Sequence, residues 1–391
     1  SWYPKHPGDV NGFVFREQAQ ALSSADYRLG VITPAFRSLT TPNAMFGRFG
    51  LHEQVDLEIP TLRYHGVRLW SWHEQLNLEF WERTGLAAFK RYVARHGRPD
   101  VIHVHGMIYG LAWASAIKRR HGIPFVVTEH STEFALGNIR PSLLAYLKIQ
   151  IGHAQRSMAV STDLATRLTD MVPSPAGWTT MPNLVKSDFG AELTPRSKPA
   201  GPLRLLNVGM LLPKKGQRQL LEALRLAVDG GLDATLRICG GGPEATALHQ
   251  VSRDLKLEGR VELLGECDRE QVRTEMAACD IFVLSSLYET FGVVLIEALA
   301  NGKPVVATDC GGPKDIIDKG RDGLIVEKNS PHALAEGIRT VAARLESYDA
   351  IDIRARCIDR FSEATFVAKH REVYAAAADL QPMPTGGDVP W

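Results

Sequence analysis

Residues 280–308, DIFVLSSLYETFGVVLIEALANGKPVVAT, contain the pattern that decides the fold. Two runs of consecutive apolar residues, DIFVLSS at 280–286 and KPVVATD at 303–309, flank a segment with the apolar spacing of a helix. Strands that are apolar on consecutive positions are covered on both faces, and a strand–helix–strand order builds a parallel sheet with crossover helices. The stretch therefore predicts one unit of a doubly wound α/β domain.

The same alternation extends in both directions along the 391 residues. A chain of this length exceeds one ordinary core and suits two domains. Between the halves, AELTPRSKPAGP at 191–202 has three prolines and no apolar period, which indicates a linker. We predict an N-terminal domain over 1–192 and a C-terminal domain over 203–361. The other expected strands are RLGVIT (28–33), PDVIHVH (99–105), PFVVTEH (124–130), RSMAVS (156–161), LRLLNVG (203–209), ATLRICG (234–240), RVELLG (260–265) and GLIVE (323–327).

The composition argues against several classes of protein. The chain has 45 Lys+Arg against 44 Asp+Glu, a net charge of +1, whereas a nucleic-acid-binding domain usually carries a strong basic excess. The five cysteines are widely spaced without a CxxC pair, so neither a disulfide framework nor a zinc site is expected. No apolar run approaches the ~20 residues of a membrane-spanning helix. We expect a cytoplasmic protein without nucleic-acid partners, and the opening SWYP resembles the turn after a strand that is missing from this chain.

Two loops between a strand and a helix suit a phosphate. VGMLLPKKG at 208–216 carries Lys214 and Lys215 just before a helix, where a positive charge joins the exposed N–H groups and the positive end of the helix dipole. ICGGGPE at 238–244 has three glycines, which let a ligand approach the backbone closely. Solvated loop lysines and an ordinary tight turn remain alternatives, and the GxGxxG dinucleotide fingerprint is absent from the sequence.

Two glutamates flank the start of the apolar helix. Glu289 precedes Phe291 and Gly292 at the helix entrance, where it can accept hydrogen bonds from sugar hydroxyls while first-turn N–H groups face a phosphate. Glu297 lies two turns into the helix, and a buried carboxylate is costly unless it meets a partner such as a ribose hydroxyl. The alternative is a helix-entry charge at Glu289 and a surface position for Glu297.

These motifs, taken in order along the chain, resemble those of glycosyltransferase family 4, the glycosyl transferases group 1. The resemblance covers nearly the whole chain. The resemblance implies a retaining GT-B enzyme, with two doubly wound Rossmann-like domains facing a deep cleft and a segment 362–391 whose helix returns to the N-terminal domain. The matching pieces are GDVNGFVFREQAQAL (8–22), PDVIHVHG (99–106), PFVVTEHS (124–131), VGMLLPKKG, CGGGPE, the E-x7-E spacing from Glu289 to Glu297, and FSEATFVAKHREVY (361–374).

The resemblance also implies residue roles. Lys215 would hold the donor diphosphate, Glu289 the transferred sugar, and Glu297 the ribose. His130 would lie near the reacting sugar, with His105 on the acceptor side. The expected catalytic residues are therefore His130, Lys215 and Glu289, and the expected donor-binding residues are Gly12, Gly209, Lys215, Gly241, Cys267, Glu289, Phe291, Gly292 and Glu297.

The implied reaction moves a hexose from a nucleoside diphosphate sugar, with UDP preferred over GDP, onto a glycan, a lipid-linked molecule or a small molecule. No cofactor and no metal ion is expected, because Lys215 and helix N-terminal amides would meet the charge that develops on the leaving phosphate. A catalytically silent sugar-nucleotide-binding scaffold protein and a GT-B sugar-nucleotide epimerase are the other interpretations. Hydrolysis of the donor without acceptor separates a transferase from a pure binder.

Three further features bear on the site. Met210 stands where the family usually has an arginine beside the diphosphate, so either Lys214 substitutes or the phosphate clamp is weaker. His103 and His105 point to one face of a strand, but no third ligand accompanies them, so a metal pair is not predicted. The helix expected at 78–98 has a basic end, which suggests a solvated face or, as the alternative, peripheral contact with the inner face of a membrane.

Overall fold

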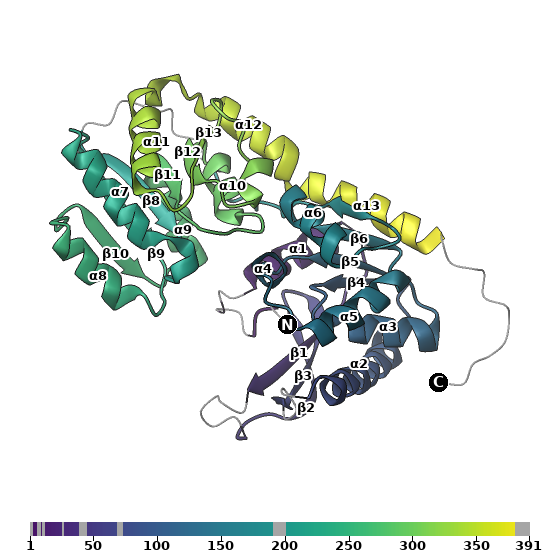
Figure 1. Cartoon of the computed structure of the whole chain (residues 1–391). Coiled ribbons are helices and arrows are strands. Elements are labelled where there is room, and N and C mark those ends of the chain that lie inside the picture. Colours follow the sequence, from purple (N-terminus) through teal and green to yellow (C-terminus); the bar gives the residue numbers. More distant parts are fainter. Residues whose placement is uncertain are drawn as a thin grey trace. The chain divides into compact units, whose positions relative to one another are not determined.

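The structure is a computed structural model that describes residues 3–5, 9, 12–25, 27–38, 45–68, 73–190 and 201–379, and Figure 1 labels its elements. These residues divide into two compact units. The first unit comprises Ser1–Val160, Leu164–Met181 and Val367–Trp391, and the second comprises Ser161–Asp163 and Pro182–Phe366. Most of the predicted linker, residues 191–200, lies outside the described residues.

The second unit is built on a six-stranded sheet with the order β10-β9-β8-β11-β12-β13, in which every neighbouring pair is parallel. All six strands coincide with apolar runs in the sequence, so the predicted α/β fold is confirmed here. The strands are β8 (Leu203–Val208), β9 (Ala234–Cys239), β10 (Val261–Gly265), β11 (Ile281–Leu284), β12 (Val305–Thr308) and β13 (Gly323–Val326). The helices are α7 (Gln217–Asp229), α8 (Ala245–Asp254), α9 (Arg269–Ala278), α10 (Val293–Ala300), α11 (Pro331–Ala343) and α12 (Ala350–Phe361).

The first unit contains a four-stranded parallel sheet with the order β4-β5-β6-β7. Helix α13 (Glu363–Asp379) packs on this sheet, since Val373, Tyr374 and Ala377 contact the core around Val126 and Met158. The strands are β4 (Ile102–His105), β5 (Phe125–Glu129), β6 (Arg156–Ala159) and β7 (Trp178–Thr180), and the further helices are α1 (Phe13–Ser23), α2 (Glu74–His96), α3 (Gly110–His121), α4 (Thr132–Leu136), α5 (Pro141–Gln150) and α6 (Thr162–Met171).

A second, mixed sheet in the first unit departs from the predicted parallel arrangement. Its order is β1-β3-β2, from β1 (Val31–Ser38), β3 (Ile59–Arg68) and β2 (Gly50–Asp56). Strands β1 and β3 are parallel, but β2 and β3 form an antiparallel hairpin. The basic end of α2 is partly paired, because Arg95 forms an ion pair with Glu53 of β2. None of the helices in the described ranges is long and apolar enough to cross a membrane.

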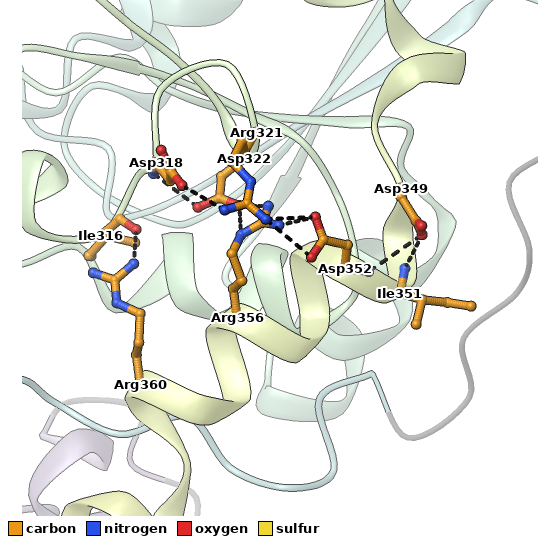
Figure 2. Close-up of polar contacts among 9 residues, drawn as sticks. All are labelled: Ile316, Asp318, Arg321, Asp322, Asp349, Ile351, Asp352, Arg356 and Arg360. Atoms are coloured by element: carbon orange, nitrogen blue, oxygen red, sulfur yellow. Dashed lines mark hydrogen bonds and ion pairs between the residues drawn. The ribbon is translucent and has the colours of Figure 1, made fainter.

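Helix α12 is fastened to the second unit by a network of charged side chains (Figure 2). Arg356 forms ion pairs with Asp322, which is 2% exposed, and with Asp352 one turn earlier on the helix. Arg360 donates from Nη1 to the carbonyl oxygen of Ile316 at 2.8 Å. The network therefore ties α12 to the segment that precedes β13.

Candidate active site

Four neighbouring strands of the second unit end at one edge of its sheet, and a predicted donor-binding residue follows each of them. Cys267 follows β10, Gly241 follows β9, Lys215 follows β8 and Glu289 follows β11. In an open parallel sheet, ligands bind outside the carboxyl ends of the strands. The strand order therefore gathers these predicted residues along the edge where a ligand is expected.

Lys215 and Glu289 meet directly at this edge. The Nζ of Lys215 donates to Oε1 of Glu289, and Ser286 Oγ donates to the same oxygen at 3.0 Å. The two side chains are 22% and 11% exposed, so the pair reaches solvent at one side only. Ser285 fixes the approach of the loops, because its Oγ donates to the carbonyl oxygen of Lys215 at 2.9 Å.

Gly216 explains why the lysine loop comes so close. It ends the short 3-10 turn Pro213–Lys215 with a φ of 66°, in the left-handed region that favours glycine. A Cβ at this position would lie 2.1 Å from the carbonyl oxygen of Ser285. Only glycine therefore allows this contact between the loops that carry Lys215 and Glu289.

The glycine turn after β9 contacts the loops on both sides. Gly240 donates its N–H to the carbonyl oxygen of Gly265 at 2.7 Å, and a Cβ on Gly240 would lie 2.0 Å from the carbonyl oxygen of Gly209. Gly241 accepts a hydrogen bond of 2.9 Å from the N–H of Leu211. Cys267 donates its thiol to the same Gly265 oxygen at 3.5 Å. The structure thus brings Gly209, Gly241 and Cys267 into one set of packed loops.

Helix α10 begins immediately after the Glu289 loop. Gly292 is its N-cap with a φ of 101°, so the first-turn N–H groups of the helix belong to the same edge of the sheet. Phe291 is 2% exposed and its ring lies edge-on to Phe361, with 5.9 Å between ring centroids. Its side chain therefore belongs to the hydrophobic core.

Glu297 is buried in α10, at 1% exposure, so the alternative of a surface position is wrong. Arg269 Nη1 donates to its Oε1 at 2.7 Å, while Oε2 has no hydrogen-bond partner among the described residues. Burial raises the pKa of this carboxyl, and the charge of Arg269 opposes that rise. The arginine also stacks over Phe189, with 4.8 Å to the ring centroid. Oε1 is thus held by Arg269, and Oε2 can still accept a hydrogen bond.

The first unit places Gly12 and His130 near one another through Phe15. Gly12 is the N-cap of α1 with a φ of 77°, and its carbonyl oxygen accepts from the N–H of Phe15 at 3.0 Å. The Phe15 ring stands edge-on to His130, with 4.8 Å between centroids. His130 directly follows β5, and its Nε2 shares a hydrogen bond of 3.2 Å with Nδ1 of His105.

Glu129, the last residue of β5, holds the loops around His130. Its carboxylate is fully buried and accepts three backbone N–H groups, from Met107 at 2.6 Å, His130 at 2.8 Å and Ser131 at 2.7 Å. Burial raises the pKa of this carboxyl, and the three N–H groups act in the opposite direction. The loops after β4 and β5 are therefore joined by one carboxylate.

Sequence reasoning missed the partners that hold these predicted residues. Ser286 could have been suspected from its place in the Glu289 loop, and Arg269 from its place beside Cys267 at a helix start. Nothing in the spacing indicates that Arg269 pairs with Glu297, 28 residues later. The roles of the predicted site residues themselves stay predictions.

Two family profiles match the chain in succession. The profile described as Glycosyltransferase Family 4 matches residues 12–189, and the profile described as Glycosyl transferases group 1 matches residues 191–357. The chain belongs to glycosyltransferase family 4. The family and the activity predicted from the sequence, those of a glycosyltransferase, are thereby confirmed.

Named relatives and solved structures agree with this membership. N-acetyl-alpha-D-glucosaminyl L-malate synthase of Bacillus anthracis is 27% identical over 299 residues, which cover 74% of this chain and 78% of that protein. Glycogen synthase of Mycobacterium tuberculosis is 28% identical over 319 residues, or 77% of this chain and 75% of that protein.

The fold is also shared with solved structures. Sucrose-phosphate synthase from Thermosynechococcus elongatus superposes with a TM-score of 0.73 at 22% identity, covering 93% of this chain and 92% of that one. Anabaena HepE, solved in complex with UDP and glucose, gives a TM-score of 0.66 at 22% identity, covering 81% of this chain and 86% of that one. This glycosyltransferase therefore has the GT-B fold.

Proposed function

We propose that this glycosyltransferase takes its sugar from a UDP-sugar, retains the anomeric configuration and needs no divalent metal ion. A relative named glycogen synthase and a fold neighbour solved with UDP-glucose support a nucleotide-sugar donor. The acceptor is a hydroxyl group of a glycan, a lipid-linked molecule or a small molecule.

The contact between Lys215 and Glu289 carries the proposal. A sugar nucleotide places a diphosphate directly beside the sugar, and this pair places a phosphate-binding cation directly beside a carboxylate that can accept from hydroxyls. In the ligand-free protein the two groups neutralise one another. A bound diphosphate would take Lys215, and Glu289 would keep its hydrogen bond from Ser286 while it accepts from the sugar.

Negative charge develops on the leaving group, the nucleoside diphosphate, during the reaction. The anomeric carbon–oxygen bond breaks with its electron pair going to the β-phosphate, while the acceptor oxygen attacks from the same face and its proton passes to the departing phosphate oxygen. Lys215 and the first-turn N–H groups of α10 would meet this negative charge as it develops. Positive charge supplied by the protein is the reason for expecting independence from divalent ions.

His130 enters as a hydrogen-bonding group rather than a proton acceptor. Burial, together with His105 and His370, holds the pKa of its imidazole well below the ordinary 6.5. It therefore stays neutral at physiological pH and would orient a hydroxyl of the sugar or the acceptor. Glu297 would accept from the ribose through Oε2, the oxygen that Arg269 leaves open.

The test begins with calorimetric titration of UDP, GDP and ADP into the wild type and into Lys215→Ala. Arg218→Ala is a matched control, since Arg218 is an exposed cation on the first turn of α7. UDP should bind most tightly, Lys215→Ala should weaken binding, and the control should not.

The enzyme should also hydrolyse UDP-sugars in the absence of an acceptor, and EDTA should leave the rate of this hydrolysis unchanged. The released sugar's anomeric proton coupling in NMR reports the stereochemistry. Absence of nucleotide binding, an inverted product, or activity that EDTA abolishes and Mg²⁺ restores would each overturn the corresponding part of the proposal.

A further inference from the structure

Helix α13 reaches the histidines of the first unit through Tyr374. The Tyr374 hydroxyl and His103 Nδ1 form a hydrogen bond of 2.7 Å, although 271 residues separate them. The other ring nitrogen of His103, Nε2, forms a hydrogen bond of 2.7 Å with Thr128 Oγ1. Because both nitrogens have partners, the orientation of the His103 ring is fixed from two sides.

The ring of His103 packs directly against the ring of His105. Its centroid lies 4.1 Å from that of His105, with 32° between the planes, so the two rings pack face against face and each restricts the other. His105 in turn shares the hydrogen bond of 3.2 Å with His130. His370 of α13 covers His103 on another side, with 5.5 Å between centroids and an exposure of 1%.

His103, His105 and His130 are neutral at physiological pH. Burial is the first cause that lowers the pKa of His103, His105 and His130, to about 3 for His105, and the charge that His370 would carry lowers all three. Two imidazolium ions at such distances would repel strongly in a dry site. The carboxylate of Glu129, the residue before His130, is already engaged by backbone N–H groups.

A neutral imidazole has one N–H donor and one acceptor nitrogen. Within the hydrogen bond between His105 and His130, one ring must donate and the other must accept, so the tautomers of the two rings are coupled. A group that fixes both the orientation and the tautomer of His105 therefore also decides which nitrogen of His130 carries its proton.

We propose that Tyr374 and His370 of α13 are positioning residues of the active site, which act through His103 and His105 to hold His130 in one orientation and one tautomer. The inference rests on the proposed function where it gives His130 a part in the reaction. A single tautomer offers a hydroxyl of the substrate one fixed donor or acceptor, and such preorganisation raises turnover without requiring tighter donor binding.

Nitrogen-15 NMR of the full chain with labelled histidine tests the positioning directly, because ring nitrogen shifts report tautomer and protonation without any need for activity. In the wild type, His130 should show a single tautomer that does not titrate between pH 8 and about 5. Tyr374→Phe should shift the ring signals of His103, His105 and His130 to a mixture of tautomers. Glu372→Gln, at an exposed position on the same helix, is the control that should change nothing.

Thr128 provides a second route to the same result. Thr128→Val removes the other hydrogen bond to His103 from β5 and should reproduce the shifts of Tyr374→Phe, whereas Thr128→Ser keeps a hydroxyl and should restore the single tautomer. His370→Leu should likewise release the rings. In UDP-sugar hydrolysis, Tyr374→Phe and Thr128→Val should lower kcat on the order of tenfold and leave KM for the donor unchanged.

The experiments distinguish a failure of the proposed function from a failure of the positioning by α13. If the wild type neither binds UDP nor hydrolyses a UDP-sugar, the proposed function is wrong, but the NMR comparison still decides the positioning. If Tyr374→Phe and Thr128→Val lower the melting temperature while the ring nitrogen shifts and kcat stay as in the wild type, α13 only stabilises the fold. That result would overturn the inference.

Discussion

Lys215 and Glu297 have different surroundings, and their substitution should affect different steps. In the proposed reaction, Lys215 would meet the charge that develops on the leaving phosphate, so Lys215→Ala should lower kcat by on the order of 10²–10³-fold. Glu297 is buried beside Arg269, so Glu297→Gln should mainly weaken UDP binding, by about 1.5–3 kcal/mol. Steady-state kinetics with calorimetry separates the two. A Lys215→Ala enzyme with intact kcat and only a raised KM would contradict the leaving-group role.

Met210 allows a gain-of-function test. Its side chain is 53% exposed, so an arginine fits there without disturbing the core. If nothing replaces the missing guanidinium, Met210→Arg should tighten UDP binding by up to about 1.5–3 kcal/mol. If Lys214 already serves that phosphate, the gain should be small, and Lys214→Ala should cost much less in the Met210→Arg background. A double-mutant cycle on the UDP dissociation constant measures this coupling.

If neither Met210→Arg nor Lys214→Ala changes the affinity for UDP, the phosphates of the donor do not lie beside the loop at 208–216.

The sequence predicts residues that stand in local motifs and misses the residues that hold them. Lys215 is predicted from the lysine loop before a helix, and Glu289 from its spacing to Glu297. The strand order then brings the two side chains together. Arg269 with Glu297, and Tyr374 with His103, are pairs from distant segments, so no local pattern contains them. Such pairs depend on how elements pack, which one unaligned sequence does not encode in its spacing.

Among the elements, the buried parallel strands are predictable and the hairpin is not. Strands such as β11 and β12 are buried at every position and almost wholly apolar, because helices cover both faces. Strands β2 and β3 mix charged, polar and apolar residues, and β2 is largely half-buried. Without a consecutive apolar run, the hairpin carries no signal of the kind that identifies the other strands.

Helix α12 gives a stability prediction at the same scale. Arg356 contacts Asp322, which is 2% exposed, and Asp352, which is 48% exposed (Figure 2). Asp322→Asn leaves the guanidinium without its buried counter-charge and should lower the free energy of unfolding by about 3–5 kcal/mol. Asp352→Asn is the matched control on the same arginine and should have little effect. Urea unfolding monitored by fluorescence and circular dichroism measures both; equal losses would contradict the importance of burial.

For the whole molecule, each unit carries its own part of the proposed chemistry. The second unit holds the charged groups assigned to the donor, Lys215, Glu289 and Glu297. The first unit holds three neutral imidazoles, those of His103, His105 and His130, and α13 packs against His103, so segments from both parts of the chain build this unit. The charged groups of the one and the neutral rings of the other should respond differently to pH.

Acid should destabilise the first unit before the second. In the unfolded chain His103, His105 and His130 bind protons below about pH 6.5, whereas the folded state binds them only at much lower pH, about 3 for His105. Depressed folded pKa values therefore stabilise the first unit fully above pH 6.5, and this stability is lost as the pH falls toward 3. Each histidine costs up to about 1.4 kcal/mol per pH unit. Glu129 acts in the opposite direction, since its folded pKa is raised, but it is one group against three.

Hydrogen exchange with mass spectrometry between pH 7 and pH 4.5, corrected for intrinsic exchange rates, measures where this loss occurs. Protection of β4 and β5 should fall with decreasing pH before that of β8 and β9 in the second unit, because the histidines of depressed pKa adjoin β4 and β5. Replacing one of the three rings, as in His105→Asn, should reduce the pH slope by up to about 1.4 kcal/mol per pH unit. Simultaneous loss in both units, or earlier loss in β8 and β9, would mean that the buried imidazoles do not govern acid unfolding.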